Sequence, residues 1–191
     1  MATSRRGAVF LDRDGTIIRQ VELLHEVERM RILPGAAQAI KLFNEAALRV
    51  VVVTNQPVVA RGLSTEADVR KLHDVLNLRL KKQKAHVDTF YFCPHHPNAT
   101  LEGYRQACEC RKPNPGMILQ AAAEHGIDLS SSVMIGDTTQ DILTGKRAGV
   151  KTILVRTGHG GRDPWQYDCV PDMTAANLME AANLWLTRIG L

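Results

Sequence analysis

Acidic and amide side chains follow three short apolar segments of this sequence, at the point where each segment ends. The run Asp12-Arg13-Asp14-Gly15-Thr16 comes directly after the first segment. Thr54-Asn55-Gln56 follows the second, and Gly136-Asp137 follows the third, with Asp141 one helical turn later. Carboxylates that converge in one crevice repel one another unless a cation neutralises them, and hard oxygen ligands suit Mg²⁺. These residue types therefore predict a magnesium site.

Lys112, in the run Cys110-Arg111-Lys112-Pro113, supplies the positive charge that a phosphate-transfer site also needs. A carboxylate nucleophile can approach an anionic phosphate only when Mg²⁺ and a lysine stand beside it. Each feature has an alternative when it is taken alone, since Asp-x-Asp-Gly also suits a polar turn and Lys112 a surface position. Together, the features favour an enzyme that transfers phosphate.

The segments that carry these residues predict a parallel α/β sheet. Strands are expected at residues 8–11, 48–53, 87–92, 132–135, 152–155 and 167–170. Helices are expected at residues 35–47, 65–84, 115–125, 139–148 and 175–188. Strands that alternate with helices form a doubly wound, Rossmann-like sheet, whose C-terminal strand ends line the ligand crevice. We expect one domain over residues 1–191, with the acidic residues in that crevice.

Three of the four cysteines lie within 18 residues, in a segment with little periodicity. Cys93-Pro94-His95 and Cys108-Glu109-Cys110 offer four ligands, Cys93, His95, Cys108 and Cys110, which can close a tetrahedral Zn²⁺ site. Such a site has no open position, so it would be structural and would hold the loop at 93–110 in place. A redox pair or reduced core cysteines are the alternatives. Cys169 is expected to be a buried strand residue.

Four segments together resemble, in order and spacing, the motifs of the haloacid dehalogenase superfamily. They span nearly the whole chain and are Phe10-Leu11-Asp12-Arg13-Asp14-Gly15-Thr16, Val53-Thr54-Asn55-Gln56, Arg111-Lys112-Pro113 and Gly136-Asp137-x-x-x-Asp141. The resemblance implies that Asp12 is a nucleophile that forms an aspartyl-phosphate, and that Asp14 protonates the leaving oxygen and then activates water. It also implies that Asp12, Asp137 and the backbone carbonyl of Asp14 hold Mg²⁺. Asp141 is expected to orient its neighbours.

The same resemblance implies that Thr54, Asn55 and Lys112 bind the phosphoryl group. Asp14 favours phosphate-ester hydrolysis, because dehalogenases and P-type ATPases are similar to this pattern but lack an acid two residues after the nucleophile. Phosphomutases share that acid and stay open as an alternative.

The zinc loop resembles that of the branch that holds heptose bisphosphate phosphatases and histidinol phosphatases. The spacing between the motifs leaves no room for a full cap domain, so we expect an open site. Relatives continue Thr-Asn-Gln with Ser-Gly-Ile-x-Arg-Gly, whereas this chain has Pro57-Val58-Val59-Ala60-Arg61-Gly62. Arg61 and Arg111 are candidates to bind a second anionic group. The implied substrate is a sugar phosphate such as D-glycero-D-manno-heptose 1,7-bisphosphate, with histidinol phosphate or another phosphorylated metabolite as the alternative.

The charge balance limits the partners that we expect. The chain has 24 Lys+Arg and 20 Asp+Glu, and because these charges are interspersed they do not by themselves indicate a nucleic acid or a membrane. A zinc-stabilised nucleic-acid-binding module could use the basic segment at 79–84, but it leaves the aspartates without a role. Ser4-Arg5-Arg6 resembles a twin-arginine export signal, yet the apolar run after it is too short. We expect a cytoplasmic enzyme acting on a small molecule, with an oligomeric state that the sequence leaves open, a monomer included.

Overall fold

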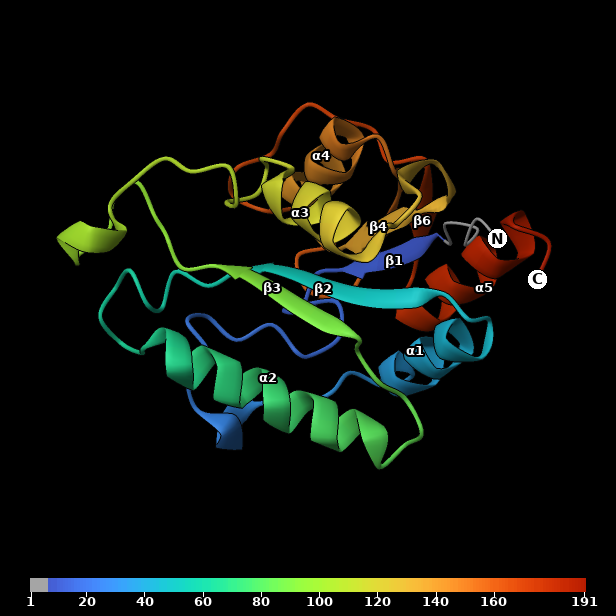
Figure 1. Ribbon diagram of the computed structural model, residues 1–191, viewed down its shortest axis with the longest axis horizontal. Coiled ribbons are helices and arrows are strands. Elements are labelled where there is room, and N and C mark those ends of the chain that lie inside the picture. Colours follow the sequence, from blue (N-terminus) through green and yellow to red (C-terminus); the bar gives the residue numbers. More distant parts are fainter. Residues whose placement is uncertain (1–6) are drawn as a thin grey trace.

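A parallel β-sheet forms the centre of the protein in a computed structural model that describes residues 7–191 (Figure 1). The run Ser4-Arg5-Arg6, which resembles an export signal, lies outside the described residues. Within the described residues the sheet has six strands in the order β3-β2-β1-β4-β5-β6, and every neighbouring pair is parallel. The strands are β1 (Ala8–Leu11), β2 (Arg49–Asn55), β3 (Thr89–Cys93), β4 (Val133–Gly136), β5 (Lys151–Val155) and β6 (Met173–Ala175).

This strand order confirms the predicted doubly wound sheet and sets the position of the crevice. The order reverses between β1 and β4, and ligands of such sheets bind beyond the carboxyl ends of the strands at that reversal. Asp12 follows β1 and Asp137 follows β4, so both residues are placed at this point.

Helices cover both faces of the sheet, with α1, α2 and α5 on one side and α3 and α4 on the other (Figure 1). Their bounds are α1 (Ala36–Glu45), α2 (Glu66–Lys81), α3 (Gly116–His125), α4 (Thr139–Ala148) and α5 (Leu178–Arg188). Side chains of a strand alternate between the faces, so Val9 and Leu11 of β1 pack in the first core cluster and Ala8 and Phe10 in the second. All four are fully buried, which explains why β1 is apolar without alternation. None of the helices in residues 7–191 has the length and hydropathy of a membrane span.

The segment after β5 differs from the prediction. No strand forms at residues 167–170, and β6 lies further on. The Asp172 carboxylate accepts hydrogen bonds from the Thr152 backbone N–H (3.0 Å) and hydroxyl (2.8 Å). These bonds bring the chain to the sheet edge only at this point. Cys169 is half-buried in the loop, where its thiol donates to the Thr139 carbonyl, so the predicted buried strand position is wrong. The predicted helix at 175–188 begins later, at Leu178, after the N-cap Asn177.

Two long connections lie at the carboxyl ends of the strands. The first joins β1 to α1 and contains the 3₁₀ turn η1 (Val27–Arg29), and the second joins β3 to α3 and contains η2 (Glu102–Tyr104). A third short turn, η3 (Leu129–Ser131), precedes β4. The absence of a full cap domain stays a prediction.

Candidate functional site

A cavity of about 640 Å³ opens at the carboxyl ends of β1, β2 and β4. Its lining includes all of the residues outside the cysteine cluster that the sequence predicts for the site: Asp12, Asp14, Thr54, Asn55, Arg61, Arg111, Lys112 and Asp137. The sheet brings them together because β1 pairs with both β2 and β4, although the three strands are far apart in the sequence.

Lys112 lies between two aspartates at the floor of the cavity. Its Nζ atom is 2.6 Å from Oδ1 of Asp12 and 2.6 Å from Oδ1 of Asp141, and all three side chains are buried. Burial lowers the pKa of Lys112, but the charges of Asp12 and Asp141 outweigh burial and hold that pKa above its ordinary value. The lysine is therefore fixed in its charged form beside the carboxylate that follows β1.

The aspartates of the floor need more positive charge than the protein supplies. Burial, followed by the charges of Asp12 and Asp141, raises the pKa of Asp137 to about 9. Burial also raises the pKa of Asp12 to about 7, although Lys112 is beside it. Oδ2 of Asp137 accepts from the His159 backbone N–H (2.7 Å), whereas Oδ1 is buried without a hydrogen-bond partner among the described residues. A divalent cation would supply the missing charge, so the donor set fits Mg²⁺.

The geometry around Asp137 also fits a small ion. Carboxylate oxygens of Asp12, Asp137 and Asp141 lie within 4.8 Å of one another. Gly15 and Gly158 both have positive φ angles and lie against the Asp137 carboxylate, where a Cβ atom at either position would overlap its oxygens. These two glycines let the backbone close around the acid without filling the space beside it.

Asp141 has two contacts that match the orienting role expected for it. Its Oδ2 accepts from the backbone N–H (3.1 Å) and hydroxyl (2.6 Å) of Thr138, which forms a capping box at the start of α4. Its Oδ1 accepts from Lys112. The carboxylate thus ties the position of Lys112 to the end of a helix.

Asn55 forms hydrogen bonds with both backbone groups of Lys112, its N–H and its carbonyl. Its side chain accepts from the Lys112 N–H (3.1 Å) and donates to the Lys112 carbonyl (3.2 Å), and it also donates to Oε1 of Gln140 (3.0 Å). These bonds occupy the amide with protein groups, so Asn55 fixes the segment that carries the lysine.

Positive charge also lines the more exposed part of the cavity, the rim, where Arg61 is exposed and Arg111 is half-buried. Arg61 and Arg111 both line it, and Arg111 donates through Nη1 to the His95 carbonyl (2.9 Å). His96 also lines the cavity, and burial, followed by the charges of Arg111 and Arg61, lowers its pKa. The Arg111 contact connects the rim to the loop that carries the cysteine cluster.

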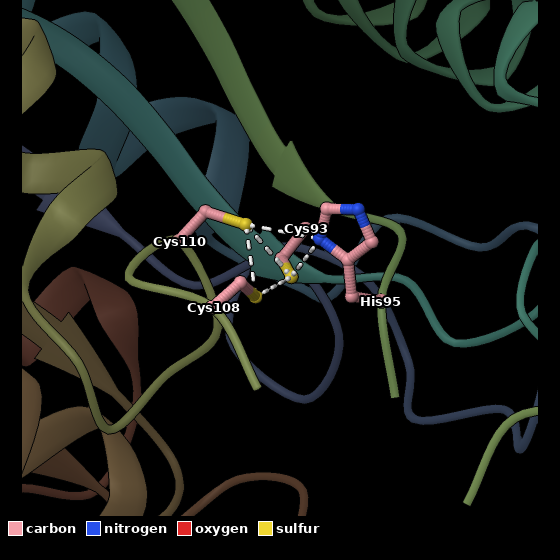
Figure 2. Close-up of side chains that lie close together, drawn as sticks. All are labelled: Cys93, His95, Cys108 and Cys110. Carbon is pink, nitrogen blue, oxygen red and sulfur yellow. Dashed lines mark hydrogen bonds between the residues drawn. The ribbon is translucent and has the colours of Figure 1, made fainter. Parts of the chain in front are cut away.

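The four predicted zinc ligands lie together at the end of β3, as Figure 2 shows. The Sγ atoms of Cys93, Cys108 and Cys110 are 3.0–3.5 Å apart, and Nδ1 of His95 is 3.7 Å from Cys93 and 3.5 Å from Cys110. A disulfide needs a separation of about 2.05 Å, so these are free thiols. Tetrahedral ligands of one Zn²⁺ lie about 3.5–3.8 Å apart, so the cluster is compatible with zinc.

The sequence did not point to several residues that the structure adds to the site. Arg13 and Gln56 bond to Asp14, and His159 bonds to Asp137. The sequence does carry a signal for two of them. Arg13 lies directly between two acids that follow a strand, and Gln56 directly follows the predicted site residues Thr54 and Asn55. Trp165 also lines the cavity, from the loop after β5, and nothing in its local pattern indicates this.

Comparisons with known proteins agree with this geometry. A family profile described as HAD-hydrolase-like, after haloacid dehalogenase, matches residues 109–181. A curated protein of Rhodopseudomonas palustris, named D-glycero-beta-D-manno-heptose-1,7-bisphosphate 7-phosphatase, is 47% identical over 146 residues, which are 76% of this chain and 81% of that protein. A protein of the same name from Escherichia coli K12 is 41% identical over 152 residues, covering 79% and 80%.

A solved structure is similar over almost its whole length. It is described as D,D-heptose 1,7-bisphosphate phosphatase from B. bronchiseptica complexed with magnesium and phosphate, and it matches with a TM-score of 0.84 at 30% identity. The match covers 95% of this chain and 99% of that one. The sheet, the acidic floor and the sequence likeness therefore indicate the same family.

Proposed function

This chain belongs to the haloacid dehalogenase-like hydrolases and is a phosphoric monoester hydrolase, and on that basis we propose that it removes the 7-phosphate of D-glycero-β-D-manno-heptose 1,7-bisphosphate. The observation that carries the substrate is the charge layout of the cavity. Asp12 and Lys112 lie at its floor, and Arg61 and Arg111 lie at its rim. A bisphosphate offers one phosphoryl group to the floor and one to the rim, whereas the cationic amine of histidinol phosphate would meet the two arginines.

The proposed reaction has two steps on the same phosphorus atom. The Asp12 carboxylate attacks the phosphorus, and the bond to the sugar oxygen breaks as Asp14 gives that oxygen a proton. Asp14 then takes a proton from water, the water oxygen attacks the aspartyl-phosphate, and inorganic phosphate leaves with Asp12 restored. Lys112 and Thr54 hold the phosphoryl oxygens, and Asn55 keeps Lys112 in place.

Asp12, Asp137 and the backbone carbonyl of Asp14 are the groups that we propose for Mg²⁺. When bound, the ion lowers the repulsion between the anionic nucleophile and the anionic phosphoryl group. The orphaned Oδ1 of Asp137 supports this proposal.

Phosphate release tests the proposed function. The purified enzyme with Mg²⁺ is expected to hydrolyse the heptose bisphosphate with a kcat/KM at least about tenfold above that for histidinol phosphate, because the rim arginines favour a second anion. Chelation should stop the reaction and added Mg²⁺ should restore it. The reverse order of substrates would contradict the heptose assignment, and no release from any phosphorylated metabolite would contradict the enzyme class.

The cysteine cluster is proposed to hold a structural Zn²⁺. The protein purified without chelator is expected to contain about one zinc per chain, and Cys110→Ser should lose it and lower the melting temperature by more than about 5 °C. Cys169→Ser is the matched control, because that thiol lies outside the cluster. Metal analysis by mass spectrometry and thermal unfolding measure both effects, and full zinc content in the Cys110 variant would exclude this ligand.

We further propose that residues 1–191 form one domain, in which the zinc loop at 93–110 is an insertion. The proposed partner is a small phosphorylated sugar, not a nucleic acid. The free thiols of the cluster support a reducing compartment, for which we propose the cytoplasm.

A further inference from the structure

A buried arginine beside Asp14 has no part in the reaction described above. Arg13 is only 1% exposed, and its guanidinium reaches three side chains. Nε donates to Oδ2 of Asp14 (2.9 Å) and Nη2 donates to Oε1 of Gln56 (2.8 Å). Nη2 also lies 2.8 Å from Oδ2 of Asp14 in an ion pair, and Nη1 lies 3.2 Å from Nε2 of His73. A charge buried to this degree is costly unless each of its donors is satisfied, so the three partners define its position.

His73 holds the far end of this guanidinium. It comes from α2, is 3% exposed, and stacks on Phe90 of β3 with ring centroids 4.7 Å apart and an interplanar angle of 14°. Burial, then the charges of Arg13 and Arg70, lowers the pKa of His73 to about 3, so the ring is neutral. A guanidinium can only donate, and Nε2 of His73 is therefore the unprotonated, accepting nitrogen.

The two oxygens of Asp14 have different surroundings. Oδ2 accepts from Nε of Arg13 (2.9 Å) and from Nε2 of Gln56 (3.1 Å), whereas Oδ1 is buried and has no hydrogen-bond partner among the described residues. These two hydrogen bonds use both lone pairs of Oδ2. Oδ1 is thus the oxygen whose lone pairs the protein leaves unused.

We propose that His73 is a positioning residue, which acts through Arg13 to fix Oδ2 of Asp14 and thereby the orientation from which this carboxyl group protonates the leaving group. This inference rests on the proposed function, because it concerns the acid of that reaction. It predicts that the identity of the leaving group decides how much His73 matters: an alkoxide must be protonated as it leaves, whereas p-nitrophenolate leaves without a proton.

The test compares two variants on two esters. His73→Phe keeps a ring against Phe90 but removes the acceptor for Arg13, and His73→Gln offers an amide oxygen in place of Nε2. For His73→Phe, the rate of the first step, measured as leaving-group release in a single turnover with enzyme in excess, is expected to fall at least about tenfold on the heptose bisphosphate and less than about threefold on p-nitrophenyl phosphate, since general acid catalysis contributes about 10²–10⁴-fold. His73→Gln should restore most of this rate. Single-turnover rates are compared instead of kcat, because the second step, in which Asp14 activates water, is the same for both esters.

Leu76→Ala is the matched control, because Leu76 is a fully buried residue of the same helix and belongs to the apolar core. It should lower stability without changing the ratio of the two first-step rates. An equal loss of the first-step rate on both esters in His73→Phe, or no loss, would overturn the positioning role. If that variant does not fold, Gln56→Met removes another Arg13 acceptor and a donor to Asp14, and the same selective loss is expected.

Failure of the inference can be separated from failure of the function. A wild-type enzyme that hydrolyses both esters, together with an unselective His73→Phe variant, contradicts the positioning role alone. A wild-type enzyme that releases phosphate from neither ester contradicts the proposed function, and the inference with it.

Discussion

Asp12→Asn is expected to reduce kcat on the heptose bisphosphate by about 10⁴-fold or more, because an amide cannot form the aspartyl-phosphate. The side chain keeps its size, so the other groups of the site should stay in place. The loss of kcat then reflects the missing covalent step. Phosphate release measures the loss, and the wild type alone should incorporate ³²P from labelled substrate after an acid quench. A variant that keeps more than about 1% of kcat would show that Asp12 is not the nucleophile.

The same variant should not be less stable than the wild type when Mg²⁺ is removed. Burial raises the pKa of Asp12 from 3.8 to about 7, so ionisation is less favourable in the folded chain than in the unfolded one. The metal-free wild type therefore loses stability as the pH rises through this range, whereas the amide of the variant has no ionisation to contribute. Thermal unfolding in chelator at pH 8 is expected to give the variant a melting temperature at or above that of the wild type. A clear fall would mean that the loss of activity reflects unfolding.

Lys112→Met is expected to lower kcat by about 10²–10³-fold and to destabilise the protein. It removes the cation that Asp12 and Asp141 share and leaves both carboxylates buried without their partner. Loss of one member of a buried ion pair costs about 3–5 kcal/mol, and loss of a charged group that stabilises the transition state costs about 10²–10³-fold in kcat. Steady-state kinetics and urea unfolding measure the two effects.

Two further substitutions make this experiment specific. Lys112→Arg keeps the charge, so we expect it to be more stable than Lys112→Met. Its activity should still be well below wild type, because a planar guanidinium cannot replace a point charge 2.6 Å from each of two oxygens. Lys146→Met removes an exposed lysine of α4 and should change neither quantity. A Lys112→Met enzyme with kcat within tenfold of wild type would rule out the proposed role.

Local patterns predicted most of the elements, for physical reasons that each segment carries within itself. The apolar runs of β1 to β5 indicate buried strands because both faces of this parallel sheet are covered, and their bounds agree within one or two residues. The capping box of Thr65 and Asp68 marks the start of α2 because its bonds span only three residues. The edge strand was misplaced, since β6 is short and its position depends on the contact between Asp172 and Thr152.

The sequence by itself determined the kind of chemistry at this site. A parallel sheet must bring the ends of its strands and the starts of the following helices to one crevice, and these ends carry Asp12, Asp14, Asp137 and Lys112. Their residue types define a charged, magnesium-dependent site. The tertiary structure alone decided which groups touch. Arg13 meets His73 because α2 packs against β3, where His73 stacks on Phe90, and Lys112 meets Asp141 because α4 packs against β4 and β5. Such contacts join residues far apart in the chain, where spacing carries no signal, so only the packed fold shows which oxygen of Asp14 is free.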